Sequence, residues 1–598
     1  MSCKQSVFAT LLLAAIVSLV PSAHAAPAVV VKAVIAGSSA MWQSMGLAAY
    51  NGNATQGNCV AGAVAPCFHY TSKNFNLNDT RPPLKGGVKL VDTNTIWIVW
   101  DSHLDPVSGN PQPNMWAYIK VDSVVGLRCY FARPRCNVTS PNPFPAGSNQ
   151  IAPAALWGDN SADLMPPVTI QALFTATNGP LVNVAASDIR PEDGLFAMCR
   201  ANSTLGGGSD SLDGLGYGIN PSGACPTVTN LANLVGSDIQ GTVSTAKAFV
   251  ADFNIVGTDP FSNIAIPAFT TVSVGAAPIV FFTRATGPLS GVTNVTDSQL
   301  QTVFGGANCG GTALGGSAGA IDAYLREPLS GTMNTTESTV FRYPDASGVS
   351  QETGVAGNAD NPLNQACGAG GGSRKRGIGT GDVVAGVKAN ARDAISYAFF
   401  SYGNVASIAD NPSFRYLTLN GVDPIFHKYG SGIDPGQPTV STGQIPGAAD
   451  VPCAGSFPCP ENQIWSGKLS FPNLRSGQYR AWAMLRLVGD GAGLAAAKIL
   501  NTKAQSFVIS STPDFVPALN VGTTDPGLRL LRSHYQQKGG GVNIGVAPIN
   551  ISAAGDKGGD MGGCVLHAVP GTTAPALAQT DSTTGLAQAA PGTECVTH

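Results

Sequence analysis

A strand pattern, a tight turn of small residues and a helical pattern follow one another repeatedly in this chain, and this unit constrains the fold most strongly. The clearest copy has an apolar strand pattern at 320–325, the turn Arg326-Glu-Pro-Leu-Ser-Gly-Thr332 and a helical pattern at 333–341. An earlier copy runs from a strand pattern at 29–35 into a helical pattern at 41–50. Strands that alternate with helices predict an α/β fold.

The turn before the 333–341 helix contains groups that suit an anion. The first N–H groups of a helix have no partner within the helix, and the helix dipole favours negative charge there. Ser330 and Thr332 add hydroxyl donors, and Gly331 lets the backbone approach a ligand closely. Arg326 has a planar guanidinium that can pair with two oxygens of one tetrahedral anion. The alternative is an ordinary capped helix beside a surface arginine, because Ser and Thr are common N-caps.

The first 25 residues have the parts of a secretory signal peptide. Lys4 supplies a positive charge, residues 7–20 are apolar, and Ala23-His-Ala25 is a cleavage site of small residues. We therefore expect a periplasmic or secreted protein that begins at Ala26 after cleavage. The apolar segment is too short to span a membrane, and no later segment has the length and hydrophobicity to do so.

Twelve cysteines follow the predicted signal peptide, since only Cys3 of the 13 lies within it. An even number favours disulfides in an exported protein. No Cys-x-x-Cys or Cys/His cluster typical of zinc sites occurs in the sequence. The spacing favours local pairs, although connectivity is not determined by sequence: 59–67, 129–136, 199–225, 309–367, 453–459 and 564–595.

The charge of the chain gives no electrostatic reason to expect nucleic acid or an anionic membrane as a partner. The net charge is −3, and charged residues make up 12% of the sequence. Glycine-rich composition predicts loops at 51–95 and 354–381. The second of these contains the basic run Arg374-Lys-Arg376, which is expected to be solvated.

The order of the motifs resembles that of the type 2 periplasmic substrate-binding proteins, specifically the phosphate-binding branch of ABC importers. The resemblance covers roughly residues 30–520, and the Arg-x-x-x-Ser-Gly-Thr pattern is its most specific part. The segments that carry it are Gly37-Ser-Ser-Ala40, Asp122-Ser-Val-Val-Gly126, Ala186-Ser-Asp188 and Arg326–Thr332.

This resemblance implies an α/β fold with two lobes and long insertions that hold most of the cysteines. Lobe one would comprise residues 28–190 plus 405–520, and lobe two residues 191–404. Residues 521–598 would form a C-terminal extension. The crossing segments between the lobes would allow them to close on a ligand.

The resemblance also implies an oxyanion, phosphate foremost, bound between the lobes, and an ABC permease as a partner. Asp188 would accept a hydrogen bond from the P–OH group of phosphate and repel sulfate, which has no proton at neutral pH. Without the resemblance, the plainer interpretation of Asp188 is a turn-forming residue. The ligand-binding residues implied are Ser39, Ala40, Ser123, Asp188, Arg326, Ser330, Gly331 and Thr332.

Enzymes and secreted structural proteins are the two alternative classes of function. Gly315-Gly-Ser-Ala-Gly319 matches the nucleophile-elbow pattern of hydrolases, but such matches arise by chance in a chain rich in Gly and Ser. No histidine lies in a convincing partner context and no cofactor motif occurs, so we expect neither an enzyme nor a cofactor. The second alternative is a secreted structural or adhesive protein on the same scaffold that has lost anion binding, since low charge and long polar insertions suit an extracellular surface.

Overall fold

The computed structural model describes the chain over defined ranges. The predicted signal peptide and most of the predicted C-terminal extension lie outside them. The described residues are 29–51, 67–79, 91–148, 163–189, 191, 194, 258–259, 262–284, 286–326, 329–341, 364–377, 379–400, 414–425, 471–475, 479, 481–510, 514–517, 577–580 and 587–589.

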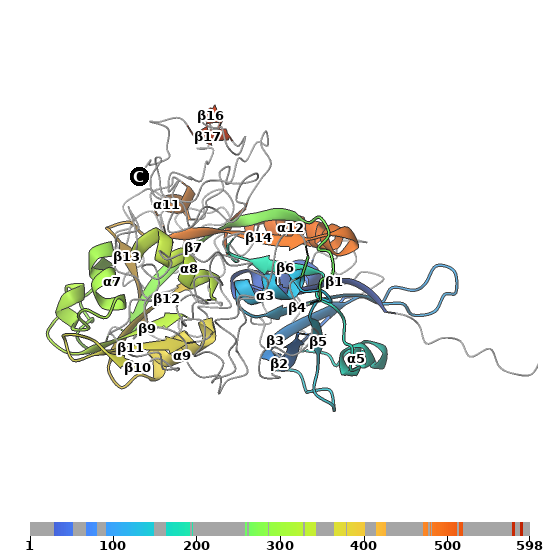
Figure 1. Cartoon of the computed structure of the whole chain (residues 1–598), viewed down its shortest axis with the longest axis horizontal. Helices are drawn as coiled ribbons and strands as arrows, with labels where there is room; N and C mark the ends of the chain where they lie inside the picture. The colour runs from blue at the N-terminus through green and yellow to red at the C-terminus, as the bar shows by residue number, and fades with distance from the viewer. Residues whose placement is uncertain are drawn as a thin grey trace, which may run out of the picture.

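Two α/β lobes share one sheet of 15 strands in the described part of the chain (Figure 1). Along the main path the order is β10-β11-β9-β12-β7-β14-β6-β1-β4-β3-β2-β5. The strands of lobe one are β1 (Val30–Gly37), β2 (Phe68–Asn78), β3 (Val91–Trp100), β4 (Asn114–Lys120), β5 (Asn137–Thr139) and β6 (Val184–Ser187). The strands of lobe two are β8 (Asn294–Val295), β9 (Ile321–Arg326), β10 (Asn364–Ala366), β11 (Ser373–Gly377), β12 (Asp393–Phe399) and β13 (Phe414–Leu419).

The two lobes are joined through the long strand β7 (Thr270–Arg284). Its first part pairs with β14 (Trp482–Gly489) and β15 (Val516–Pro517), and its second part pairs with β12 and β13. β14 in turn pairs with β6 of lobe one. β13, which follows the predicted boundary at 404/405, pairs with β7 and β8.

Helices cover both faces of the sheet. Lobe one contains α2 (Trp42–Asn51), α3 (Ser123–Phe131), α5 (Val168–Thr175) and α12 (Gly491–Ser510). Lobe two contains α7 (Asp297–Phe304), α8 (Gly331–Thr336) and α9 (Thr380–Ala389). Shorter elements are the 3-10 turns η1 (Ser39–Met41) and η5 (Gly311–Leu314), the π-helical turn η6 (Glu337–Phe341), the helix α11 (Pro472–Arg475) and the hairpin of β16 (Leu577–Thr580) and β17 (Ala587–Ala589).

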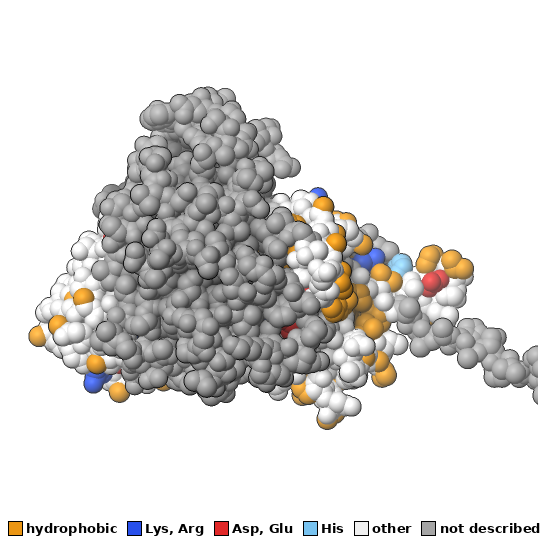
Figure 2. Space-filling view, viewed as in Figure 1, with side chains coloured by type: hydrophobic (Ala, Val, Ile, Leu, Met, Phe, Trp, Pro, Cys, Tyr) orange, Lys and Arg blue, Asp and Glu red, His pale blue; other side chains and the backbone are white. Residues whose placement is uncertain are grey.

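Two hydrophobic cores lie on opposite faces of the sheet in lobe one. In β4, Trp116 and Tyr118 belong to the core under α2 and α12, whereas Met115, Ala117 and Ile119 belong to the core under α3. Successive strand residues point to opposite faces, so a strand buried on both faces is apolar throughout. The first of these cores continues into lobe two. On the face shown in Figure 2, charged side chains are few and scattered among the described residues.

The predicted strand–turn–helix units are present. The strand at 320–325 is β9, and the helical pattern after the turn is α8 followed by η6. At the start of α7, Thr296 and Gln299 form a reciprocal capping box.

Two predicted loops are wrong. β2 lies within the predicted loop 51–95, and it pairs along its length with β3. The predicted loop 354–381 contains β10 and β11, and its basic run forms β11 rather than a solvated loop. Arg374 is fully buried, where it donates to the carbonyl of Phe304 and to Gln365, and Lys375 pairs with Asp322 at 2.8 Å. These partners supply the polar contacts that water would otherwise provide.

Two of the predicted disulfides are formed, Cys129–Cys136 and Cys309–Cys367. Cys67 is also disulfide-bonded. The other cysteines of the predicted pairs lie outside the described residues. None of the helices in the described part of the chain has the length and hydrophobicity needed to cross a membrane.

Candidate functional site

The carboxyl ends of four strands meet where the two lobes face each other. β1 is parallel to both β4 and β6, so the turns that follow these strands emerge at one edge of the sheet. These turns lead to Ser39, Ser123 and Asp188. The turn after β9 brings Arg326 and Gly331 to the same place from lobe two. Ligands of open α/β sheets bind at such edges.

Arg326 is buried and makes contacts on both sides of this junction. Its Nη1 donates to Thr380 Oγ1 at 2.7 Å, and its Nη2 forms an ion pair with Asp122. Its backbone N–H donates to the hydroxyl of Tyr397 at 3.3 Å. The guanidinium of lobe two is therefore held against the turn that opens α3 in lobe one.

Thr380 links the same arginine to the first turn of lobe one. Thr380 is the first residue of α9, and its Oγ1 lies 3.2 Å from Ser39 Oγ. The neighbouring N–H of Ala40 donates to Ser38 Oγ at 3.2 Å, so in this structure it serves the cap of η1. Ser39, Thr380 and Arg326 thus form a connected polar chain from one lobe to the other.

Ser123, Asp188 and Gly331 form a second contact between the lobes. Ser123 Oγ donates to Asp188 Oδ1. A Cβ atom on Gly331 would lie 1.7 Å from Asp188 Oδ1 and 2.6 Å from Ser123 Oγ. Both distances are far below van der Waals contact, so only glycine fits here.

Burial raises the pKa of Asp188 from 3.8 to about 7. Desolvation is the largest cause, and it is opposed by a backbone hydrogen bond and by the positive charges of Arg326 and Arg486. The nearby carboxylate of Asp122 adds to the rise. Near pH 7, Asp188 therefore exists in two forms: a carboxylate, which only accepts hydrogen bonds, and a protonated group, which can donate one.

Ser330 and Thr332 lie at the start of α8 and are both buried. Ser330 Oγ accepts from the N–H of Met333 at 3.4 Å, and the Ser330 carbonyl accepts from Asn334 Nδ2 at 2.8 Å. Ser330 thus takes the capping contact that the alternative interpretation predicts. That contact also fixes the turn that carries Gly331 against Asp188.

The structure brings the predicted site residues together in two connected groups. Arg326 and Ser39 belong to the first group, and Ser123, Asp188 and Gly331 belong to the second. The adjacent residues Asp122 and Ser123 join the groups. Ser330 and Thr332 flank Gly331, and Ala40 follows Ser39.

Two further residues of this site, Asp122 and Thr380, were missed as site residues. Asp122 stands directly before Ser123 at the end of a strand, which is a signal that was available in the sequence. Thr380 follows Gly379 at the start of a helical pattern, but nothing in the sequence places that helix beside Arg326. Among the described residues, no group of three or more His, Cys, Asp or Glu side chains could hold a metal ion.

Comparisons with known proteins give likenesses of fold only. No protein-family model and no curated protein sequence matches the chain. Similar solved structures include an ABC-type phosphate transport receptor from Vibrio cholerae, with 13% identity over 40% of this chain and 69% of that one, and a TM-score of 0.22. A phosphate-binding protein from Stenotrophomonas maltophilia has 13% identity over 65% and 76%, with a TM-score of 0.29. A high-affinity periplasmic phosphate-binding protein bound with phosphate has 13% identity over 68% and 84%, with a TM-score of 0.29. At these values, neither ligand nor site residues transfer to this chain.

Proposed function

We propose that this protein is an exported binding protein that holds a tetrahedral oxyanion, phosphate foremost, between its two lobes. One observation carries the proposal. Groups from separate parts of the chain converge around Asp122 and Asp188. They are a buried arginine, two hydroxyl groups and the glycine at the start of α8. A buried dianion requires such a set of fixed donors, because it loses its hydration when it enters the protein.

Arg326 is the main cationic group of the proposed site. In this structure its Nη2 pairs with Asp122, so an anion would share or replace that contact. A bidentate guanidinium offers two parallel N–H groups to an oxyanion, which a lysine cannot do. Ser39 and Ser123 would add hydroxyl donors, and Gly331 and Thr332 would add backbone N–H groups at the start of α8.

Asp188 supports phosphate over sulfate. When ionised, its carboxylate accepts a hydrogen bond from the P–OH group of hydrogen phosphate, whereas it repels a fully ionised anion. Because the pKa of Asp188 is about 7, this preference should be complete only above neutral pH. We propose a binding role without catalysis, and an ABC permease as the recipient of the ligand in the periplasm.

The function is tested by the ligand content and the titration of purified protein. Phosphate released on denaturation should approach one equivalent per chain, and after its removal calorimetry should detect phosphate binding at pH 8. Absence of both would reject the proposal. In that case, a secreted structural or adhesive protein on the same scaffold becomes the better explanation, since the contacts between Arg326, Thr380 and Asp122 would then serve only to hold the lobes together.

A further inference from the structure

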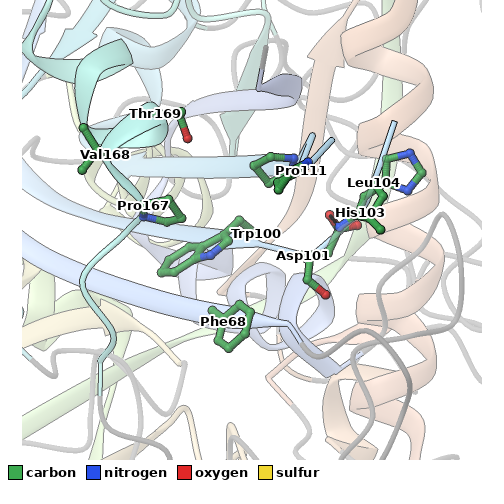
Figure 3. Close-up of a pocket in the computed structure, with 11 residues that line it drawn as sticks. Phe68, Trp100, Asp101, His103, Leu104, Pro111, Pro167, Val168 and Thr169 are labelled. Carbon is green, nitrogen blue, oxygen red and sulfur yellow. Dashed lines mark hydrogen bonds between the residues drawn. The ribbon is translucent and has the colours of Figure 1, made fainter. Parts of the chain in front are cut away.

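A cavity of about 410 Å³ lies in lobe one, in a part of the molecule that the oxyanion site does not use (Figure 3). Its walls come from the start of β2, the end of β3, the loop at 101–113 and the start of α5. In Figure 3, Pro167 and Val168 lie on one side of the Trp100 ring, and Pro111 and Leu104 lie on the other. The volume falls within the roughly 300–1,000 Å³ of small-molecule pockets.

Rigid apolar side chains form the walls of this cavity. The rings of Phe68 and Trp100 are stacked, with centroids 5.7 Å apart and an interplanar angle of 29°. Pro111, Pro113 and Pro167 also line it. Proline has almost no side-chain entropy to lose, so these walls need little ordering when a ligand enters.

The charged groups of the cavity disfavour an ionic ligand. Neither lysine nor arginine is found among the described residues that line it, so it offers an anion no permanent positive charge. Asp101 is buried, and its carboxylate already accepts from the side chain and the backbone of Asn114 at 2.8 and 2.9 Å. It also accepts from the N–H of His103 at 3.1 Å. A cation would therefore meet a carboxylate whose hydrogen bonds are already made.

Exposed apolar side chains also lie at the cavity. Val168 is 79% exposed and Leu104 is 53% exposed, and both line the cavity. Leu164 and Met165 are exposed just before Pro167. A concentration of exposed apolar side chains around a preformed cavity indicates a binding site.

We propose that this cavity is a second binding site, which takes a small, neutral and apolar molecule with a flat ring that stacks against Trp100. The stacked aromatic pair provides the flat surface, the prolines fix its width, and the lack of a permanent positive charge selects against anions. The site is independent of the oxyanion site, so phosphate should neither compete with its ligand nor be required for it.

The test uses the neutral fluorescent probe N-phenyl-1-naphthylamine with the full oxidised chain. The probe should bind saturably at one site per chain, and excess phosphate should leave the titration unchanged. Val168→Asp places a charge at the rim and should weaken probe binding by about tenfold or more. Since Val168 is largely exposed, this change should leave the fold intact, and circular dichroism checks it.

Val107→Asp is the matched control, because Val107 is 94% exposed in the same loop as Leu104 but does not line the cavity. Its titration should match that of the wild type within about twofold. Lack of saturable binding to the wild type, or equal effects of the two substitutions, overturns the proposal. An oligomer of the wild type that Val168→Asp alone dissociates overturns it too, since the surface would then be an interface between copies of this chain.

Discussion

Arg326 at the end of β9 and Asp122 immediately before α3 form an ion pair that joins the two lobes. Their side chains are only 3% and 10% exposed. When one partner of a buried pair is removed, the other is left as an uncompensated charge, which is far costlier than losing a surface pair. The same arginine therefore supports both lobe closure and the proposed anion site.

Arg326→Ala should abolish measurable phosphate binding and lower the free energy of unfolding by about 3–5 kcal/mol. The reason is that the substitution removes the cationic fork and leaves Asp122 without its buried partner. Calorimetric titration and urea unfolding measure the two effects. Arg392→Ala is the control, because Arg392 is 50% exposed and lies 3.7 Å from Asp322, so it should change neither quantity appreciably. Unchanged phosphate affinity in Arg326→Ala would contradict the proposed site.

Asp188→Asn should reduce the preference for phosphate over sulfate more than it reduces phosphate affinity. The amide keeps one acceptor oxygen but adds a donor and removes the charge that repels sulfate. Calorimetry with both anions at pH 8 measures the ratio of affinities. Asp393→Asn is the matched control, since Asp393 is a buried aspartate that accepts from the N–H groups of Gly287 and Leu289, away from this site. An equal loss of selectivity in both variants would refute the role of Asp188.

Sulfate binding to the wild type should weaken as the pH rises through about 7, and Asp188→Asn should remove this dependence. Below that pH, Asp188 is protonated and can donate to sulfate; above it, the carboxylate repels the anion. Sulfate does not titrate in this range, so the change in affinity reports the protein group. A sulfate affinity that is flat between pH 6 and 8 would show that Asp188 does not face the ligand.

The free energy of unfolding should also depend on the protonation of Asp188. Its folded-state pKa is raised from 3.8 to about 7, so the folded protein binds more protons than the unfolded chain between these values. The stabilisation is therefore fully present below pH 3.8 and is lost as the pH rises through 7, with a magnitude of the order of 4 kcal/mol. Urea unfolding of the wild type and Asp188→Asn from pH 5 to 8 isolates this contribution, because other groups titrate in both proteins. If the free energy of unfolding changed with pH in the same way in both proteins, the contribution of Asp188 would be refuted.

Gly331→Ala should disrupt the contact between α8 and Asp188. The added methyl group would lie 1.7 Å from Asp188 Oδ1, so the helix start or the carboxylate must shift. We expect loss of phosphate affinity and a destabilisation of about 1–3 kcal/mol. Gly381→Ala is the control, since nothing lies within 4 Å of its added Cβ in α9, and alanine there should stabilise the helix by up to about 1 kcal/mol.

The strand–turn–helix unit at 320–341 was predictable because its apolar residues, its serine cap and its glycine all favour the same local structure. The strands β2 and β11 were not, since their sequences are rich in Asn, Ser or basic residues that disfavour strands on their own. Pairing with β3 and β9 overrides this local preference. Arg374 shows the same limit, because its burial depends on Gln365 and on the carbonyl of Phe304.

The residues of the candidate site were also only partly predictable from the sequence. Residues next to a motif in the sequence, such as Ser330 beside Gly331, were found from local patterns. Thr380 was not, because its contact with Ser39 spans 341 positions and exists only once both lobes are in place. A single sequence carries no direct record of such a long-range contact.

β7 has a mechanical and energetic consequence for the whole molecule. Its 15 residues supply sheet partners to β14 on one side of the junction and to β12 and β13 on the other. In the described part of the chain, β7 therefore belongs to the sheets of both lobes, and its removal would leave β12 and β14 with an unpaired edge. We therefore expect the described parts of the two lobes to be coupled in unfolding, because a loss of β7 from one sheet removes a strand from the other.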